Sequence, residues 1–593
     1  MNNILKKDGK TLLLGNEAIV RGALESGVNF ASTYPGTPAS EIGDTFSKIA
    51  KETGIYFEYS TNEKTAFEAA LGASLSGLKS FVSMKHFGLN VALDSFLPSV
   101  YINAPLVIAV SDDPNCWSSV QEEEDSRYIS MLANVPLLEP SDSQECKEFT
   151  IESFKIAEQF STPVMIRLTT RTSHNSGIVH LEPYNIQKRQ GNFIKNESRF
   201  NTLSPRIIEM HTQVIEKLNK IKEYSEKSPL NKIFNDSSSD LAIITSGISF
   251  SYIMTILEEN NLKIPLLKLG ITYPLCEKKI ISFLKIKKKI LVIEELEPFL
   301  ENAIKAIAQK NKINIEIYGK DVLPRAGEFN VGILKKALKK MGINLDYSEN
   351  EKVKELINSL PKRFPILCAG CPHRTVFYAV KKTLPDAIYA GDIGCYLLGI
   401  LPPLKALDFI LDMGAGIGVA HGIKKSTTQK VVAFIGDSTF FHSGFAGLVN
   451  MVFNKSNALV MILDNRVTAM TGHQKNPSSV LDIEKIAKAL GIKNVKTVDA
   501  YNFQELKKTI KKFSDSNELS VIIAKRECVF LKPRDSFKVK YEITEACKNC
   551  RICLEIGCPA IEFGEKIKIN RSLCSGCALC AQICPNKAIK AAK

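Results

Sequence analysis

The chain has 593 residues, of which 45% are hydrophobic and 24% are charged, and its net charge is +14. These values are ordinary for a soluble globular protein of about four domains. The sequence does not indicate a membrane protein, because its longest apolar stretches, such as 100–111, are interrupted and too short to cross a bilayer.

The charge distribution and the cysteine content indicate which partners and which cellular compartment to expect. Its lysines are spread along the sequence, which favours a solvated surface over nucleic-acid binding, with steering of an acidic redox partner as the alternative. The first residues do not read as a secretory leader. Fifteen cysteines in such a chain indicate metal ligation in a reducing compartment, so we expect a cytoplasmic protein.

Periodicity predicts several α/β units followed by a small module. Apolar runs at 106–110 and 163–168 alternate with segments of helical period, which favours a parallel sheet. A polar stretch then contains a predicted helix over 204–228. Further strands are predicted in two later units, at 241–245, 290–294, 313–318, 431–435, 459–463 and 520–524.

The C-terminal module carries two tandem cysteine runs with the spacing of a pair of 4Fe–4S clusters. Each run has cysteines at i, i+3 and i+6 and a fourth before a proline, and that fourth cysteine ligates the other cluster. A zinc ribbon would leave the third cysteine and the Cys-Pro pair without a role. The crosswise assignment is Cys547, Cys550, Cys553 and Cys584 for the first cluster, and Cys574, Cys577, Cys580 and Cys558 for the second.

Two predicted neighbouring strands end in acidic and amide side chains. Gly436-Asp437-Ser438 follows the run 431–435, and Asp464-Asn465 ends the next strand. Carboxyl ends of parallel strands are where α/β sheets bind ligands, and oxygen ligands there suit Mg²⁺ with cofactor phosphates. The pattern resembles the diphosphate motif of thiamine-diphosphate enzymes, with Ser438 for its second Gly and Asp464 for its first Asn.

A glycine-rich stretch precedes this motif. Gly414-x-Gly416-x-Gly418 has the wrong spacing for a dinucleotide loop, and no acidic residue ends a following strand at the required distance. Tight helix packing, or close approach of the backbone to a thiazole or diphosphate, explains Gly414 and Gly416 better.

Together these motifs resemble the alpha subunits of the thiamine-diphosphate-dependent 2-oxoacid:ferredoxin oxidoreductases, and within them the indolepyruvate branch. The resemblance covers essentially the whole chain. It rests on YPGTPASE (34–41), TNEKTAFEAALGAS (61–74), MKHFGLNVA (84–92), EEEDSRY (122–128), LGITYPLCEK (269–278), EELEPFLE (294–301), CAGCPHR (368–374), GDIGCY (391–396) and DNRVTAMTGHQ (464–474). It implies a pyrimidine-binding domain at 1–183, a linker at 184–240, a transketolase-C-terminal-like domain at 241–350, a thiamine diphosphate and Mg²⁺ domain at 351–537 and a ferredoxin-type module at 538–593.

The resemblance also implies catalytic residues. Glu63 resembles the glutamate that hydrogen-bonds N1′ of the aminopyrimidine; Glu68 is the rival, and an N-cap or surface glutamate is the other interpretation. Thr37 and Arg127 resemble positions near the substrate. Arg127 could pair with the substrate carboxylate, or alternatively form a surface ion pair with the acidic run 122–125.

Further residues follow from the same resemblance. A diphosphate and Mg²⁺ site is implied at Gly436, Asp437, Ser438, Asn465 and the backbone carbonyl of Val467. Four histidines inside or beside matched stretches suit either proton shuttling and diphosphate anchoring or a hydrogen-bonded structural role. They are, in order of preference, His86 and His473, then His373 and His421.

A separate cysteine set resembles the ligands of a third cluster close to the thiamine. Its members are Cys368, Cys371, Cys395 and Cys528. Buried thiols without a metal are the alternative, as we expect for Cys116, Cys146 and Cys276. Three four-iron clusters correspond to about twelve irons per chain, and two clusters to about eight.

The activity implied by the family is oxidative decarboxylation of aryl 2-oxoacids, such as indolepyruvate and phenylpyruvate, to the acyl-CoA. CO₂ is released and single electrons pass to ferredoxin. Pyruvate or branched 2-oxoacids are alternative substrates; a non-catalytic electron-transfer subunit and an aldehyde-releasing thiamine decarboxylase are alternative classes. The implied partners are a smaller beta subunit in an α2β2 assembly, ferredoxin and CoA, with no nucleic acid and no membrane.

Overall fold

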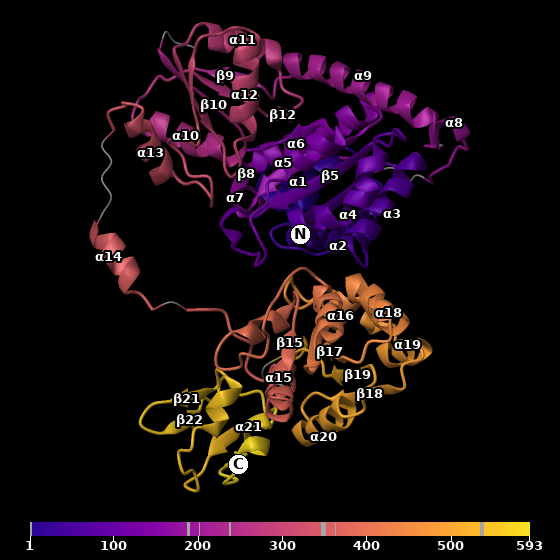
Figure 1. Ribbon diagram of the computed structural model, residues 1–593. Coiled ribbons are helices and arrows are strands. Elements are labelled where there is room, and N and C mark those ends of the chain that lie inside the picture. Colours follow the sequence, from indigo (N-terminus) through magenta and orange to yellow (C-terminus); the bar gives the residue numbers. More distant parts are fainter. Residues whose placement is uncertain are drawn as a thin grey trace. The chain divides into compact units, whose positions relative to one another are not determined.

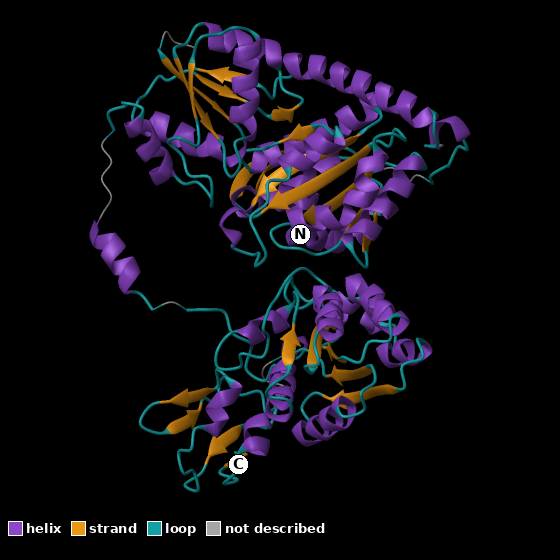
Figure 2. Cartoon of the chain, in the orientation of Figure 1, coloured by secondary structure: helices purple, strands orange, loops and turns teal. Residues whose placement is uncertain are grey.

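The computed structural model describes residues 3–186, 190–200, 202–235, 239–345, 351–361, 363–533 and 539–592. The chain folds as two compact units, Met1–Glu355 and Leu356–Lys593. In both units helices flank the strands of mainly parallel sheets, which confirms the expected α/β class (Figures 1 and 2). The expected boundaries at 350 and 537 fall outside the described residues.

A seven-stranded sheet organises the first part of unit 1, in the order β12-β6-β7-β5-β4-β2-β3. Its strands are β2 (Phe30–Thr33), β3 (Tyr56–Tyr59), β4 (Ser80–Lys85), β5 (Leu106–Asp112), β6 (Leu137–Leu138), β7 (Pro163–Thr169) and β12 (Ile271–Tyr273). Every residue of β5 and β7 is buried, as expected for central strands covered by helices on both faces. Only the edge pair β12–β6 is antiparallel, and β12 comes from a segment far along the chain.

Helices and a short ribbon complete this part of unit 1. The helices are α1 (Gly15–Glu25), α2 (Ser40–Thr53), α3 (Glu63–Leu75), α4 (His86–Ser99), α5 (Arg127–Ala133), α6 (Ser143–Phe160) and α7 (Thr170–His174). The antiparallel ribbon pairs β1 (Gly9–Leu14) with β8 (Ser176–Leu181). Polar N-caps begin several helices; Asn62, for example, accepts a hydrogen bond from the Thr65 amide at the start of α3.

A second sheet of unit 1 has the order β14-β13-β10-β11-β9. Its strands are β9 (Lys232–Phe234), β10 (Leu241–Thr245), β11 (Leu266–Lys268), β13 (Lys289–Ile293) and β14 (Glu316–Tyr318). Its helices are α10 (Gly247–Glu259), α11 (Glu277–Lys285), α12 (Phe299–Lys310) and α13 (Val331–Lys340). The expected linker contains two helices, α8 (Glu197–Phe200) and α9 (Arg206–Lys227), and α9 is the long helix that the sequence predicted. The linker also contains β9, which was not predicted and which pairs antiparallel with β11.

Unit 2 is built on a five-stranded parallel sheet in the order β15-β16-β17-β19-β18. Its strands are β15 (Ile388–Ala390), β16 (Val431–Gly436), β17 (Leu459–Asp464), β18 (Asn494–Asp499) and β19 (Ser520–Lys525). Its helices are α14 (Glu351–Ser359), which begins in unit 1, α15 (Pro372–Thr383), α16 (Ala415–Ser426), α17 (Asp437–Thr439), α18 (Phe445–Phe453), α19 (Ile483–Ala489) and α20 (Phe503–Ser514). Alternate residues of β16 enter separate cores on the two faces of the sheet.

The cysteine-rich module belongs to unit 2. It contains the antiparallel pairs β20 (Tyr541–Ile543) with β23 (Ile589–Ala591) and β21 (Ile561–Phe563) with β22 (Ile567–Ile569), and helix α21 (Leu579–Ile583). Ile556 and Leu579 of the module share one hydrophobic core with Phe377 of α15, so the module packs directly on the α/β domain. Across the described residues no helix is long and apolar enough to cross a membrane.

Candidate cofactor and cluster sites

The carboxyl ends of β16 and β17 bring two acidic side chains together. Asp437 follows β16, and its Oδ2 accepts hydrogen bonds from Ser478 Oγ at 2.6 Å and Asn476 Nδ2 at 3.1 Å. Burial, and then the neighbouring Asp464 carboxylate, raise the pKa of Asp437 to about 6. A divalent cation would relieve this repulsion, so the donor set fits Mg²⁺. Sequence reasoning missed Asn476 and Ser478, which orient Asp437.

The loop after β17 is held in a defined shape. Asn465 Oδ1 accepts from the Val467 amide at 3.2 Å, which leaves the amide oxygen a second lone pair for an ion. Ser438 Oγ lies 2.9 Å from Thr468 Oγ1. The Asn465 carbonyl accepts from the Cys528 amide at 3.1 Å, so the loop of the diphosphate motif directly adjoins a cysteine of the expected third set.

The glycine pattern at the start of α16 serves close packing. Gly414 has φ +94°, and a Cβ added to it would lie 2.7 Å from Ser443 Cβ. A Cβ on Gly416 would lie 3.1 Å from Asp392 Oδ2, whose carboxylate also accepts from the Gly414 amide at 3.1 Å. Burial raises the pKa of Asp392 to about 8. Of the two interpretations offered for these glycines, the contacts support tight packing, and Asp392 was not predicted.

In unit 1, Glu63 begins α3 as a buried side chain, 4% exposed. A Cβ added to Gly88 of α4 would lie 2.7 Å from Glu63 Oε1, so only glycine leaves room for this carboxyl group. Glu68, in contrast, is exposed and accepts from Ser95 Oγ at 2.6 Å. Burial against another helix favours Glu63 over Glu68 as the functional glutamate, and its catalytic role stays a prediction.

Residues around Glu63 come from three other segments. Burial lowers the pKa of Lys85, while the charges of Asp113 and Glu63 act to raise it, so the ammonium group lies within reach of both. The Lys85 stem covers Gly36, where an added Cβ would lie 2.9 Å from Lys85 Cδ. The adjacent Thr37 is partly exposed, with its Oγ1 3.1 Å from Ser40 Oγ. Lys85 was not singled out from the sequence.

His86 lies fully buried at the start of α4. Its Nδ1 is 3.2 Å from the Ser111 carbonyl, whereas its Nε2 has no hydrogen-bond partner among the described residues. Burial lowers the pKa of His86, so the ring is neutral near pH 7. A proton on Nδ1 then leaves Nε2 as an acceptor, which suits a proton-handling role.

Arg127 has a different environment from the one expected for a substrate contact. Its Nε and Nη2 donate to Asp125, its Nη1 donates to Glu294 at 2.6 Å, and Nη2 also donates to the carbonyls of Glu295 and Glu297. Because every guanidinium nitrogen donates to a protein acceptor, the contacts favour a structural role for Arg127 over substrate binding, which stays a prediction. The alternative, an ion pair with the acidic run, agrees with the contacts, although the pair is buried and not on the surface.

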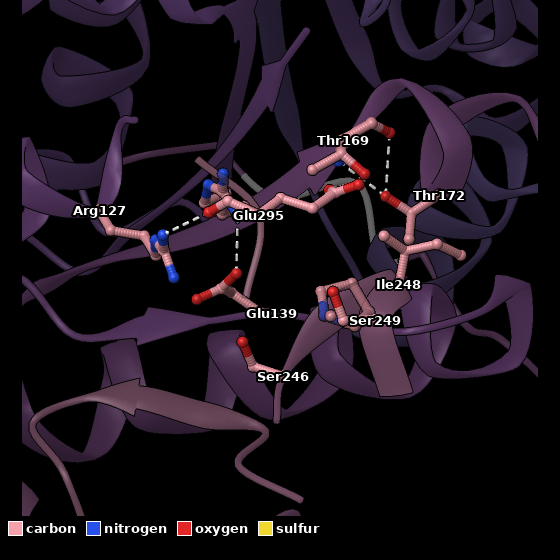
Figure 3. A pocket seen from close by; sticks show the side chains of 11 residues that line it. Arg127, Glu139, Thr169, Thr172, Ser246, Ile248, Ser249 and Glu295 are labelled. Atoms are coloured by element: carbon pink, nitrogen blue, oxygen red, sulfur yellow. Dashed lines mark hydrogen bonds and ion pairs between the residues drawn. The ribbon is translucent and has the colours of Figure 1, made fainter. Parts of the chain in front are cut away.

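A small cavity beside Arg127 lies between the two sheets of unit 1. Figure 3 shows Arg127 and Glu139 on one side, Thr169 and Thr172 on the other, and Ser246, Ile248 and Ser249 from the start of α10. Within the described residues, Glu139 Oε1, Arg167 Nη2 and Thr169 Oγ1 lack hydrogen-bond partners. This mixture of donors and acceptors suits ordered water more than a cofactor.

The C-terminal cysteines gather into the two crosswise sets. Burial raises the pKa of Cys553 to about 11, and the charges of Cys547, Cys550 and Cys584 act in the same direction. The neighbours that act in this way on Cys580 are Cys577, Cys558 and Cys574. None of the described cysteines forms a disulfide, so four thiols per set fit a four-iron cluster.

In the described ranges no three ligand-type side chains are already at the spacing of one metal ion. Cysteines at the corners of a cluster lie farther apart than the ligands of one ion. The assignment to clusters therefore depends on which cysteines lie near Cys553 and which lie near Cys580.

The expected third set is also brought together. Burial raises the pKa of Cys395 to about 12, with Cys528 and Cys368 adding to the rise, and Cys395 and Cys368 act likewise on Cys371. His473 Nε2 lies 3.7 Å from Cys528 Sγ, which places this histidine beside the cysteine set.

The other predicted histidines and cysteines differ in their surroundings. Burial lowers the pKa of His373 to about 4. His421 Nδ1 has no partner within the described segments. Cys146 and Cys276 are buried and Cys116 is partly buried, in agreement with structural roles.

Three known domain families match separate segments of the chain. A domain described as "Pyruvate flavodoxin/ferredoxin oxidoreductase, thiamine diP-bdg" matches residues 21–228. "Thiamine pyrophosphate enzyme, C-terminal TPP binding domain" matches 392–524, and "4Fe-4S binding domain" matches 567–590. The fold and the cysteine sets thus define a thiamine-enzyme-type chain that carries a ferredoxin-type iron–sulfur module.

Curated relatives match nearly the full chain. The indolepyruvate oxidoreductase subunit IorA of Methanothermobacter thermautotrophicus is 40% identical over 609 residues, covering 99% of this chain and 98% of the relative. Those of Pyrococcus horikoshii and Archaeoglobus fulgidus are 41% and 39% identical and cover 98% of this chain, with 96% and 98% of their own lengths matched. The chain belongs to the family of indolepyruvate oxidoreductase subunit IorA.

Among solved structures, a 2-oxoglutarate:ferredoxin oxidoreductase from Magnetococcus marinus is similar to this chain, and the alignment covers 56% of this chain and 65% of the solved chain. Its sequence identity is 16% and its TM-score is 0.47.

Proposed function

We propose that the chain is the thiamine-diphosphate-dependent subunit of an enzyme that oxidatively decarboxylates aryl 2-oxoacids of the indolepyruvate type. The acyl group is transferred to CoA and the electrons pass one at a time to ferredoxin. One observation carries the proposal: the loop that follows β17, beside the buried Asp437, is hydrogen-bonded through the Asn465 carbonyl to the Cys528 amide. A diphosphate site and a cysteine set on adjoining loops suit transfer of electrons from a cofactor to a cluster.

The environments of the residues support the roles that we propose for them. Bound thiamine diphosphate supplies the nucleophilic carbon and the electron sink that decarboxylation requires. Asp437, Asn465 and the Val467 carbonyl would hold Mg²⁺, which would supply positive charge for the diphosphate. Glu63 would hold a proton at N1′ of the aminopyrimidine, and the burial of its carboxyl group would limit competition from water there. The neutral His86 ring accepts or releases a proton at Nε2.

The cysteine sets and the partners complete the proposal. The set Cys368, Cys371, Cys395 and Cys528 would hold a cluster near the diphosphate motif, and the two C-terminal sets would hold two more; such clusters would supply one-electron transfer toward ferredoxin. Names of the relatives as subunit IorA support a second, smaller subunit, which we propose joins this chain as α2β2. Part of the lysine-rich surface would steer the acidic ferredoxin.

Viologen reduction by the anaerobically purified chain, co-expressed with its small partner, tests the proposal. We expect reduction to require thiamine diphosphate, Mg²⁺ and CoA, and to be fastest with indolepyruvate in a panel of 2-oxoacids. Glu63→Gln should abolish turnover with iron content intact, whereas the exposed Glu68→Gln serves as the matched control and should keep it. Turnover by Glu63→Gln, or aldehyde formation independent of CoA, would contradict the proposal.

A further inference from the structure

Arg374 is a buried cation with an unusual set of partners. It lies in the first turn of α15 and is 3% exposed. Its guanidinium donates to the main-chain carbonyls of Leu367, Cys368 at 3.0 Å, Ile556 at 2.9 Å and Gly557 at 2.6 Å. Within the described ranges no carboxylate pairs with it. A buried charge without a counter-charge is strongly unfavourable, so some other negative charge must balance it.

The four carbonyls belong to two cysteine loops. Leu367 and Cys368 open the loop of the expected third cluster, and Ile556 and Gly557 immediately precede Cys558 of the second C-terminal set. Gly557 has φ +62°, and a Cβ there would lie 3.1 Å from Arg374 Nη1. The guanidinium therefore binds both loops at once, and the left-handed glycine lets the second loop approach it.

The two cysteine sets are in direct contact around this arginine. A Cβ added to Gly370, between Cys368 and Cys371, would lie only 1.7 Å from Ser575 Oγ, between Cys574 and Cys577. The cavity lined by the second C-terminal set, namely Cys558, Cys574, Cys577 and Cys580, is also lined by Cys371 and Arg374. A thiolate-ligated cluster in that cavity would supply the negative charge that Arg374 lacks.

We propose that Arg374 is a positioning residue that raises the reduction potential of the second C-terminal cluster and fixes it beside the third. This inference rests on the proposed function, because it requires both clusters. Each reduction adds one negative charge to a cluster. A fixed buried cation stabilises the reduced form in a low-dielectric surrounding, and charge is one of the factors that set cluster potentials.

The test compares variants of the full chain, co-expressed with its partner, in redox titrations followed by electron paramagnetic resonance. The signal that Cys577→Ser alters identifies the second cluster. In Arg374→Met we expect its reduced-to-oxidised ratio at a fixed potential to fall at least tenfold, which is a midpoint lower by about 59 mV. Arg374→Lys keeps the charge and should stay within threefold of wild type.

Lys382→Met is the matched control, since Lys382 lies on the same helix, 47% exposed, and pairs with Glu555 at 2.8 Å. It should leave the potential unchanged. An unchanged ratio in Arg374→Met with full iron content would overturn the proposal. If Arg374→Met loses iron, Arg374→Gln, which is polar but uncharged, decides: a tenfold fall in the ratio supports the proposal, and a ratio equal to that of wild type overturns it. Wild-type protein with all cluster signals but no 2-oxoacid turnover would count against the proposed function alone.

Discussion

The buried ion-pair network around Arg127 leads to a sharp prediction. Arg127→Met removes the cation that faces Asp125 and Glu294 and leaves both carboxylates without their main partner. Breaking a buried pair in this way costs about 3–5 kcal/mol. The exposed pair Arg171–Glu328 is the matched control, because Arg171 is 49% exposed and exposed pairs contribute about 0–1 kcal/mol.

Hydrogen exchange of the full chain measures the difference. Amides of β13 and α12, which flank Glu294, should exchange faster in Arg127→Met by roughly two to three and a half orders of magnitude, since about 1.4 kcal/mol corresponds to a factor of ten. Arg171→Met should change them less than about tenfold. Unaltered exchange in Arg127→Met, together with a raised KM for the 2-oxoacid, would refute the structural role and restore Arg127 as a substrate residue.

Three further predictions concern charge and metal. Burial raises the pKa of Glu295 to about 7. Because the unfolded chain ionises this group near pH 4.5, the free energy of unfolding should fall as pH rises from about 4.5 through 7. Glu295→Gln removes the buried charge and should raise the free energy of unfolding at pH 8 by about 3 kcal/mol, as measured by hydrogen exchange. Protons should compete with Mg²⁺ for the Asp437 carboxylate, whose pKa is about 6. Calorimetry should therefore show that Mg²⁺-dependent binding of thiamine diphosphate weakens below about pH 6. Binding that does not depend on pH would contradict a Mg²⁺ site at Asp437. Iron analysis should give about twelve atoms per chain and about eight in Cys371→Ala, whereas about eight in both would exclude a third cluster.

The local motifs could be predicted because their chemistry depends on short spacing. Cysteines at i, i+3 and i+6 can surround a cluster only from one loop, and a residue at the end of a predicted parallel strand must lie at the ligand-binding edge. The strands that end before Asp437 and Asn465, the long helix of the polar stretch and the mixed α/β class were therefore all predicted correctly.

The partners of buried polar groups could not be predicted, because they come from distant parts of the chain. Arg127 donates to Glu294, 167 residues away, and Arg374 to the Ile556 carbonyl, 182 residues away. Asn476 and Ser478 reach Asp437 from a loop beyond the next strand. A buried charge must be balanced wherever the folded chain brings it, and this requirement leaves no periodic trace in sequence. Residue types and spacing thus determined which chemistry this protein carries, whereas tertiary packing decided which charges serve that chemistry and which hold the fold together.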